Sequence, residues 1–301
     1  MSLLCSGVAN STARSYASSQ RRYLRFCSLI DSKPLPATEV DLLSFIADSV
    51  SRGLAASTIS AHIAGVRNLH IINGFENPLE RFQRLRLVLR AVKRRGKPPR
   101  KRSPITAELL ARIGALVDSA RPDDVRFWAA ATSAFFGFLR VSEFTVDRNF
   151  DAASDLSFDA LRFSHDAAHL TLKASKTDPF RLGVSVHLGA TGRAVCPVSA
   201  LKQFLFLRGT APGPLFADAF GSPPSRSWFV GTLSRFLARL GVVGDFTAHS
   251  FRIGAATTAA ERGVPDHLIK VLGRWSSDAY RVYIRTSERR VCALSRTLVA
   301  S

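Results

Sequence analysis

Residues 248–285 read AHSFRIGAATTAAERGVPDHLIKVLGRWSSDAYRVYIR. The segment combines histidine, arginines, a tryptophan and two tyrosines, without a cysteine cluster, an acidic pair or a glycine-rich phosphate loop. Its spacing predicts a first helix with His249 and Arg252 three residues apart on one face. A short second helix and a last helix follow, and the last one carries Tyr280 and Tyr283.

These residue types fit one reaction, the attack of a tyrosine on a phosphodiester. A phenol has a pKa of about 10, so its oxygen needs nearby cations to become a nucleophile. Charge builds up on the non-bridging oxygens of the phosphate under attack, and arginine side chains and a histidine N–H can bind that charge without a metal. The leaving 5′-oxygen needs a proton, which a lysine can donate. We therefore look for a second arginine and a lysine elsewhere in the chain.

Two other segments supply these groups. FGFLRVSEF, at residues 136–144, carries Arg140 in what is predicted to be an apolar helix, where an unpaired charge is costly. Glu143, three residues later, can hold this arginine. KASKTD, at residues 173–178, carries Lys176 at the tip of a predicted hairpin, a position suited to reaching a scissile site.

The pattern of apolar residues divides the chain into three parts. Residues 1–96 have helical spacing throughout and predict a small helical bundle, whose last helix is capped by Asn77 and stopped by Gly96. Residues 97–104 form a basic, proline-containing linker. Residues 105–301 mix helices with period-two alternation, which predicts a small antiparallel sheet. The predicted fold class is mainly α with a small antiparallel β-sheet (α+β).

Composition argues against several classes of protein. The 301 residues are 46% hydrophobic, enough for two domains with buried cores. No run of about 18 apolar residues predicts a membrane span, and no secretory signal is recognisable. The four cysteines lie far apart and predict neither disulfides nor a zinc site. His165 and His169 lack a third ligand nearby in the sequence, so we expect no metal and no cofactor.

Charge is the strongest global signal. The net charge is +19, and residues 1–103 hold 18 of the 42 basic side chains but only 6 of the 23 acidic ones. Such a field attracts polyanions and speeds their encounter with the protein. A merely basic surface is the alternative, but an excess of this size favours a nucleic-acid partner.

The candidate DNA contacts lie in two places. Seven of the twelve residues of KRRGKPPRKRSP, at 93–104, are basic, which favours phosphate contact over a plain solvated spacer and also suits a nuclear-import patch. The polar face of the third N-terminal helix can contact DNA or simply be solvated. The candidates are Lys93, Arg94, Arg95, Lys97, Arg100, Lys101 and Arg102 in the first place, and Ser60, His62 and Arg67 in the second.

Four sequence motifs (boxes) of this chain, which occur in the order found in that family, resemble those of the tyrosine recombinases, the superfamily of the phage integrases, Cre and XerD. FLRVSEF resembles the box with the first arginine, SKTD the hairpin with the lysine, and HSFRIGAAT the His-x-x-Arg box. GRWSSDAYRVYIR resembles the last box, with tryptophan where many bacterial members have histidine. This ending is most like that of the eukaryotic enzymes of DIRS-type mobile elements, and the N-terminal half resembles the core-binding domain of the family.

The resemblance implies an enzyme that cuts and rejoins DNA strands without metal or ATP. Three side chains would bind the scissile phosphate, namely Arg140, His249 and Arg252, and His249 would also assist proton movement. Lys176 would protonate the leaving 5′-hydroxyl. Trp275 would pack and hydrogen-bond near the phosphate.

The resemblance also implies a nucleophile and a supporting residue. Tyr283 would form a 3′-phosphotyrosine bond, and Glu143 would orient the site rather than react. One departure leaves a rival open, because Trp275 and Tyr283 lie eight residues apart, one fewer than in many bacterial members. Tyr280 lies about one turn earlier on the same helix face, although alignment of VYIR favours Tyr283.

The implied architecture is a clamp around double-stranded DNA. Residues 1–96 would be the core-binding domain, residues 97–104 the basic linker, and residues 105–301 the catalytic domain with a C-terminal tail that docks on a neighbouring subunit. We expect a dimer at each recombination site, a tetramer on paired sites, no membrane association, and a nuclear location in a eukaryote or a cytoplasmic one with the chromosome otherwise. A DNA-binding regulator that no longer cuts, and a type IB topoisomerase, are the alternatives.

Overall fold

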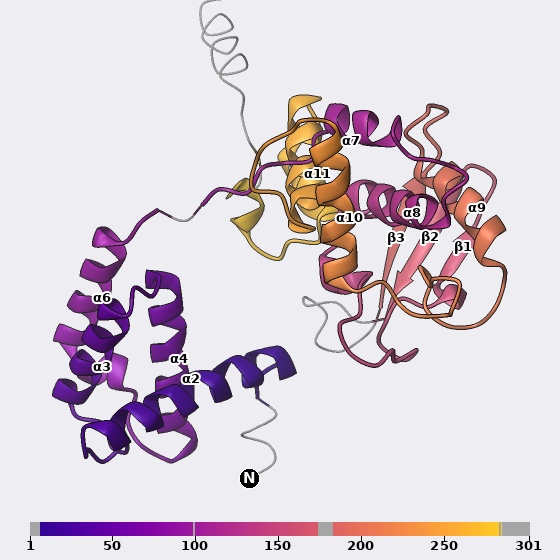
Figure 1. Ribbon diagram of the computed structural model, residues 1–301. Helices are drawn as coiled ribbons and strands as arrows, with labels where there is room; N and C mark the ends of the chain where they lie inside the picture. The colour runs from indigo at the N-terminus through magenta and orange to yellow at the C-terminus, as the bar shows by residue number, and fades with distance from the viewer. Residues whose placement is uncertain (1–6, 99, 174–182, 283, 285–301) are drawn as a thin grey trace, which may run out of the picture. The chain divides into compact units, whose positions relative to one another are not determined.

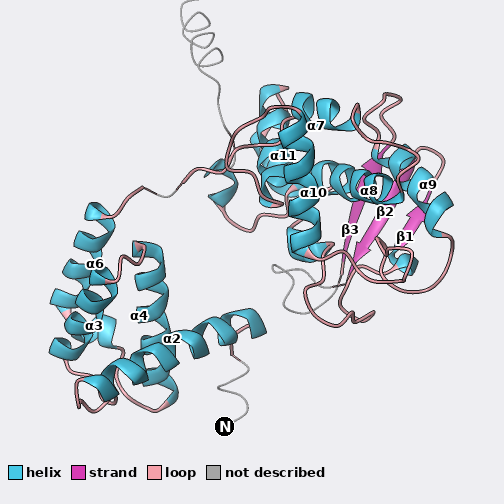
Figure 2. Ribbon diagram, viewed as in Figure 1, coloured by secondary structure: helices cyan, strands magenta, loops and turns pink. Residues whose placement is uncertain are grey.

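The computed structural model describes residues 7–98, 100–173, 183–282 and 284. The chain divides into two compact units, residues 1–99 (unit 1) and residues 100–301 (unit 2). Figure 1 follows each unit along the chain, and Figure 2 shows that helices dominate both, with strands in unit 2 only among the described residues. No helix in the described part of the chain is long and apolar enough to cross a membrane.

Unit 1 is a small bundle of helices around its own core. Tyr23, Phe45, Ile59 and Ile63 are fully buried at helical spacing and hold the bundle together. The capping residue Thr38 accepts a hydrogen bond from a backbone N–H in the first turn of its helix, as a capping box does. The helices are α2 (Asn10–Leu29), α3 (Glu39–Ser51), α4 (Ala56–Ile72), α5 (Pro78–Arg81) and α6 (Gln83–Arg95).

The single helix expected between Asn77 and Gly96 is two helices. Asn77 caps the first and Gly96 ends the second, as predicted. Between them Phe82 has extended backbone angles, φ −106° and ψ 105°, which interrupt the helical hydrogen bonds. The ring of Phe82 packs against the core of unit 1, so the side chain that was expected inside the helix lies at a bend instead.

Unit 2 is built from helices and one three-stranded sheet. Helices α8 and α9 pack on each other, and α9 also contacts strands β2 and β3. The helices are α7 (Ala107–Gly114), α8 (Pro122–Phe136), α9 (Pro197–Arg208), α10 (Arg226–Arg239), α11 (His249–Glu261) and α12 (Asp266–Leu272); the 3-10 helices are η1 (Val141–Glu143), η2 (Phe158–Ala160) and η3 (Asp278–Val282); the strands are β1 (Leu161–Phe163), β2 (Ala167–Leu172) and β3 (Val184–Gly189).

The sheet is antiparallel in the order β1-β2-β3 and confirms the period-two alternation. Leu170 of β2 lies opposite Val186 of β3, and both are buried, as is Leu188. His187 lies on the exposed side opposite His169. The alternation therefore turns one face of the sheet toward the core of unit 2.

The end of the linker is part of unit 2. The Ile105 N–H donates to the Ser250 carbonyl at 2.9 Å, and the Ser103 N–H donates to the Asp245 carbonyl at 2.9 Å. A Cβ atom at Gly254 of α11 would overlap the backbone carbonyl of Ile105. The chain segment that enters unit 2 therefore lies directly against α11, with room for no side chain between them.

This close approach predicts that Gly254→Ala destabilises unit 2. Neither backbone can move away without losing the Ile105–Ser250 hydrogen bond, so we expect a loss of more than about 3 kcal/mol or a failure to fold. Denaturant unfolding followed by tryptophan fluorescence measures this, since all three tryptophans lie in unit 2.

The matched control is Gly231→Ala on α10, where an added Cβ meets nothing within 4 Å. There alanine should stabilise the helix by roughly 0.5–1 kcal/mol. Equal stability of Gly254→Ala and the wild type would contradict the close backbone contact.

Candidate functional site

Arg252 is the most deeply buried cation of the candidate site. It lies in the first turn of α11, and only 1% of its surface is exposed. Its Nη1 donates to the Phe138 carbonyl at 2.5 Å, its Nη2 donates to the Gly273 carbonyl, and its guanidinium carbon lies 4.3 Å from the Trp275 ring centroid. A buried charge is costly unless it has such partners. The fold therefore fixes this guanidinium by contacts from two distant segments.

Arg140 lies close to this site, but it does not lie in a helix as the sequence suggested. Helix α8 ends at Phe136, Phe138 has a φ of +48°, and Arg140 leads into η1. Its Nη1 donates to Glu143 Oε1 at 2.8 Å, and its backbone N–H donates to Glu143 Oε2 at 2.8 Å. Its Nη2 donates to the Arg274 carbonyl at 3.3 Å. Glu143 holds Arg140, as predicted.

Glu143 is a buried carboxylate between two arginines. Burial by itself raises the pKa of Glu143, but the charge of Arg274 and the hydrogen bonds from Arg140 outweigh burial and hold the pKa below its usual range. The Arg274 Nη2 donates to Glu143 Oε2 at 2.9 Å. Glu143 is therefore ionised at neutral pH and can orient both cations.

His249 lies among the arginines of the site. Burial lowers its pKa, and the positive charges of Arg252, Arg140, Arg102 and Arg226 lower it further. These arginines come from α11, the residue before η1, the linker and α10. His249 is therefore neutral at pH 7, with one ring nitrogen that donates and one that accepts. We call the two guanidinium cations of Arg140 and Arg252, together with the neutral ring of His249, the cationic cluster.

Trp275 covers one side of the cationic cluster. Its ring lies edge-on to Phe138, with centroids 6.2 Å apart, and tilted against Tyr280 at 6.1 Å. A Cβ atom at Gly273 would overlap the indole ring, so only glycine lets the tryptophan fold back over this turn. The packing role expected of Trp275 thus has a clear geometric basis.

Of the candidate residues Tyr280, Tyr283 and Lys176, the structure describes Tyr280. Tyr280 is 3% exposed, belongs to the core of unit 2, and donates from its hydroxyl to Asp266 Oδ2 at 3.4 Å. Tyr283 and Lys176 lie outside the described residues. The nearby Lys173 is bound to the Asp159 carboxylate at 3.1 Å and to the Ser157 hydroxyl at 2.9 Å.

Arg274 and Arg226 are residues of the site that the sequence reasoning missed. Arg274 stands in the GRW motif, but its contacts with Glu143 and with the Gly137 carbonyl span more than a hundred residues. Arg226 opens α10 and acts on His249 through its charge. The sequence shows that Arg274 precedes Trp275, but it does not show that Glu143 is the partner of this arginine.

The candidate DNA contacts of unit 1 and the linker are mostly exposed. Ser60, Arg67, Lys93, Arg94, Arg95, Lys97, Arg100 and Lys101 are all exposed. Arg102 is exposed as well but forms an ion pair with Asp245. His62 is an exception to the expected polar face, since it is half-buried beside Phe45, with ring centroids 6.1 Å apart.

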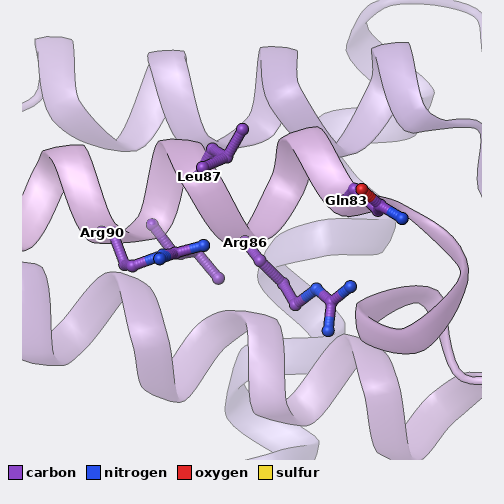
Figure 3. A pocket seen from close by; sticks show the side chains of 5 residues that line it. Gln83, Arg86, Leu87 and Arg90 are labelled. Carbon is purple, nitrogen blue, oxygen red and sulfur yellow. The ribbon is translucent and has the colours of Figure 1, made fainter.

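Helix α6 carries basic residues that the sequence reasoning did not single out. Arg86 and Arg90, one turn apart, line a hollow of about 470 Å³ together with Gln83 and Leu87 (Figure 3). Both arginines are exposed, and neither has an ion-pair partner among the described residues. Arg84 on the same helix differs, because it pairs with Glu39 at 3.4 Å. Arg86 and Arg90 are therefore available to an anionic partner.

Two histidines lie side by side on the exposed face of the sheet. The Nδ1 atoms of His169 and His187 lie 2.7 Å apart, and the Ser164 hydroxyl contacts the other nitrogen of His169 at 2.9 Å. Within the described ranges, no three histidine, cysteine or acidic side chains gather as metal ligands. His165, the residue first paired with His169, is exposed.

Comparison with known proteins points to one group. No family model matches the chain. The tyrosine recombinase XerC of Brucella melitensis biotype 1 is 27% identical over 302 aligned positions, which cover 94% of this chain and 87% of that protein. XerC of Brucella suis biovar 1 matches to the same extent.

Two solved structures have a similar fold. XerH site-specific recombinase bound to a palindromic difH substrate, in a post-cleavage complex, has a TM-score of 0.69 and 16% identity, and the match covers 96% of this chain and 80% of that one. A lambda integrase dimer bound to a COC′ core site has a TM-score of 0.62 and 19% identity, with 93% and 73% covered. The predicted fold class is confirmed, and the resemblance to the tyrosine recombinase superfamily is supported. The narrower likeness to DIRS-type enzymes stays a prediction.

The environment of His249 predicts a pH dependence of stability. Its pKa in the folded protein lies below the value of about 6.5 found in an unfolded chain, so the unfolded chain takes up the proton more readily. The uncharged ring of His249 therefore contributes fully to stability above the pKa of the histidine in the unfolded chain. This contribution is lost as the pH falls from there toward the pKa of His249 in the folded protein.

Denaturant unfolding of the wild type and His249→Gln at several pH values below neutrality measures the effect. The other histidines cancel in the difference between the two proteins, and the wild type should lose up to about 1.4 kcal/mol more per pH unit within this window. Parallel pH profiles of the two proteins would contradict a half-buried histidine surrounded by cations.

Proposed function

We propose that this chain is a site-specific DNA recombinase that cuts and rejoins strands through a covalent 3′-phosphotyrosine. The observation that carries the proposal is the cationic cluster, in which Arg140 comes together with His249 and Arg252 of α11 beside Trp275. Similarity to tyrosine recombinases over nearly the whole chain supports it. The presence of every reactive residue type favours an active enzyme over a regulator that has lost cleavage.

The reaction follows from the charges. Arg140 and Arg252 neutralise the non-bridging oxygens as the phosphorus becomes five-coordinate, and neutral His249 donates a hydrogen bond to the same oxygens. The Tyr283 hydroxyl gives its proton to the accepting ring nitrogen of His249, and its oxygen forms the new bond to phosphorus while the bond to the 5′-oxygen breaks. Lys176 supplies the proton that leaves with this oxygen. The phosphotyrosine keeps the energy of the broken bond, so a 5′-hydroxyl of another strand reverses the step without ATP.

Tyr283 is the proposed nucleophile in preference to Tyr280. Tyr280 is almost completely buried, and its hydroxyl contacts Asp266. A phenol in such a place has no room for a DNA strand. The alignment of VYIR with the last box of the family favours Tyr283 independently.

Several basic surfaces would hold the DNA. The linker residues and the exposed arginines of α6 carry the excess positive charge, and contacts to phosphates are independent of sequence. We infer that unit 1 and unit 2 both grip the duplex, as the clamp of the family does.

We also infer that several copies act together, with a dimer at each site and a tetramer on paired sites. Val291, Leu294 and Leu298 recur at helical spacing, and such an apolar stripe needs a surface to cover it. Unit 2 offers a mostly apolar hollow of about 790 Å³ lined by residues that include Phe136 and Ala255. Docking of the stripe into this hollow on a neighbouring copy would join the subunits.

The biological setting is proposed on sequence grounds alone. The final box is most like that of DIRS-type elements, so integration or excision of a mobile element is the proposed role. The basic stretch at residues 93–104 suits nuclear import in a eukaryotic host.

The nucleophile can be tested directly. We expect the wild type to form a covalent protein–DNA adduct with a pool of nicked duplexes of randomised sequence, detected after denaturation in detergent. Tyr283→Phe should abolish the adduct, because no other group supplies the attacking oxygen. Tyr280→Phe should retain it and lose only about 0.5–1.5 kcal/mol of stability with its hydrogen bond to Asp266.

Loss of the adduct in Tyr280→Phe and its retention in Tyr283→Phe would identify Tyr280 as the nucleophile. Absence of any adduct, together with tight binding to a subset of the pool, would favour a DNA-binding regulator. Adducts that relax supercoiled DNA but never join two duplexes would favour a topoisomerase.

The contribution of α6 can be measured by salt dependence. Each lost phosphate contact lowers the slope of log affinity against log salt by about 0.9, so Arg86→Gln with Arg90→Gln should lower it by about 1.8. Affinity should fall to a similar degree on every DNA sequence. Titrations of labelled duplex at several salt concentrations give both quantities.

Arg84→Gln is the matched control, because this arginine belongs to the same helix but is paired with Glu39. It should leave the slope nearly unchanged. An unchanged slope in the double variant as well would exclude α6 from the DNA surface.

A further inference from the structure

Arg274 lies in a strained and nearly enclosed position between Gly273 and Trp275. Its φ is +52°, a backbone region that residues other than glycine, asparagine and aspartate seldom occupy, and only 11% of its side chain is exposed. Phe138, which it contacts, has a φ of +48°. Strain of this kind is maintained only where surrounding contacts enforce it, and it gathers at functional sites.

The contacts of Arg274 join two segments that both reach the cationic cluster. Its Nη1 donates to the Gly137 carbonyl at 3.0 Å, and its Nη2 donates to the Phe138 carbonyl at 3.2 Å and to Glu143 Oε2 at 2.9 Å. Its own carbonyl accepts the Nη2 of Arg140 at 3.3 Å. The side chain and the backbone of one residue thus fix Glu143 and Arg140 at the same time.

The charges explain why a second arginine is needed. Glu143 is 2% exposed at its side chain and ionised, and it lies against both arginines at 2.8 and 2.9 Å. A carboxylate that faced Arg140 alone would neutralise it and draw its guanidinium inward. With Arg274 present, the buried Arg–Glu–Arg triad keeps a net positive charge, and removal of one partner leaves an imbalance in a poorly solvated place.

We propose that Arg274 is a positioning residue that keeps the guanidinium of Arg140 correctly oriented toward the phosphate. It acts through Glu143 and through its own carbonyl. The inference rests on the proposed function, since it assumes that Arg140 binds a phosphate.

The test uses the full chain and inorganic phosphate as the probe, with binding followed through the NMR signal of the His249 ring. Arg274→Met should weaken phosphate binding about tenfold, a size typical of coupling within one ion-pair network. Arg274→Lys keeps the charge but has one nitrogen for three acceptors, so it should recover part of the affinity. Arg148→Met, which removes an arginine paired with Asp155 instead, should bind phosphate as the wild type does.

A second variant separates positioning from folding. In Arg274→Met with Glu143→Gln, no unbalanced carboxylate remains, so the loss caused by the Arg274 change should be smaller than in the wild-type background. If Arg274→Met does not fold, Arg274→Lys and this double variant carry the comparison. Melting followed by tryptophan fluorescence identifies the folded variants.

The outcomes distinguish the two proposals. Weaker phosphate binding in Arg140→Gln, with wild-type binding in both Arg274 variants, would overturn the role of Arg274 and leave the proposed function intact. Wild-type binding in Arg140→Gln, or no binding by the wild type, would overturn the phosphate site and the role of Arg274 with it.

Discussion

The site depends on one buried guanidinium. Arg252 donates to the carbonyl oxygens of Phe138, just beyond α8, and of Gly273, just beyond α12, and the Trp275 ring lies against its guanidinium. A cation in this position is stable only if all of these partners are in place. The burial of Arg252 therefore requires that three segments distant in sequence come together, and their meeting also brings Arg140 and His249 to the same place.

Local sequence patterns predicted the helices and strands better than they predicted the contacts between them. Alternation along residues 184–188 marked a strand, and the His-x-x-Arg spacing marked one helix face, because both depend on neighbours in the chain. Arg140 was expected inside a helix, yet Phe138 leaves the helical region, and only the carbonyl acceptors supplied to Arg252 and Arg274 account for that turn. Arg274 meets its partner Glu143 only through tertiary packing, and the periodicity of a sequence does not encode such packing.

Two populations of cations have separate roles. Most of those of α6 and the linker are exposed and have no ion-pair partner among the described residues, whereas Arg252 and Arg274 are enclosed and hydrogen-bonded to backbone carbonyls. Exposed charges are effective at long range and are sensitive to counterions, whereas enclosed ones act on a single group at short range. Net charge, visible in the sequence, reports the first population and says nothing of the second.

The attachment of the linker to α11 has a mechanical consequence. Ile105 is bonded to Ser250, and Gly254 touches the Ile105 carbonyl, so a pull on the segment between the units is delivered to the helix that carries His249 and Arg252. The start of unit 2 and the helix that holds the cationic cluster are therefore anchored to each other, and a change in the path of one backbone requires a change in the other.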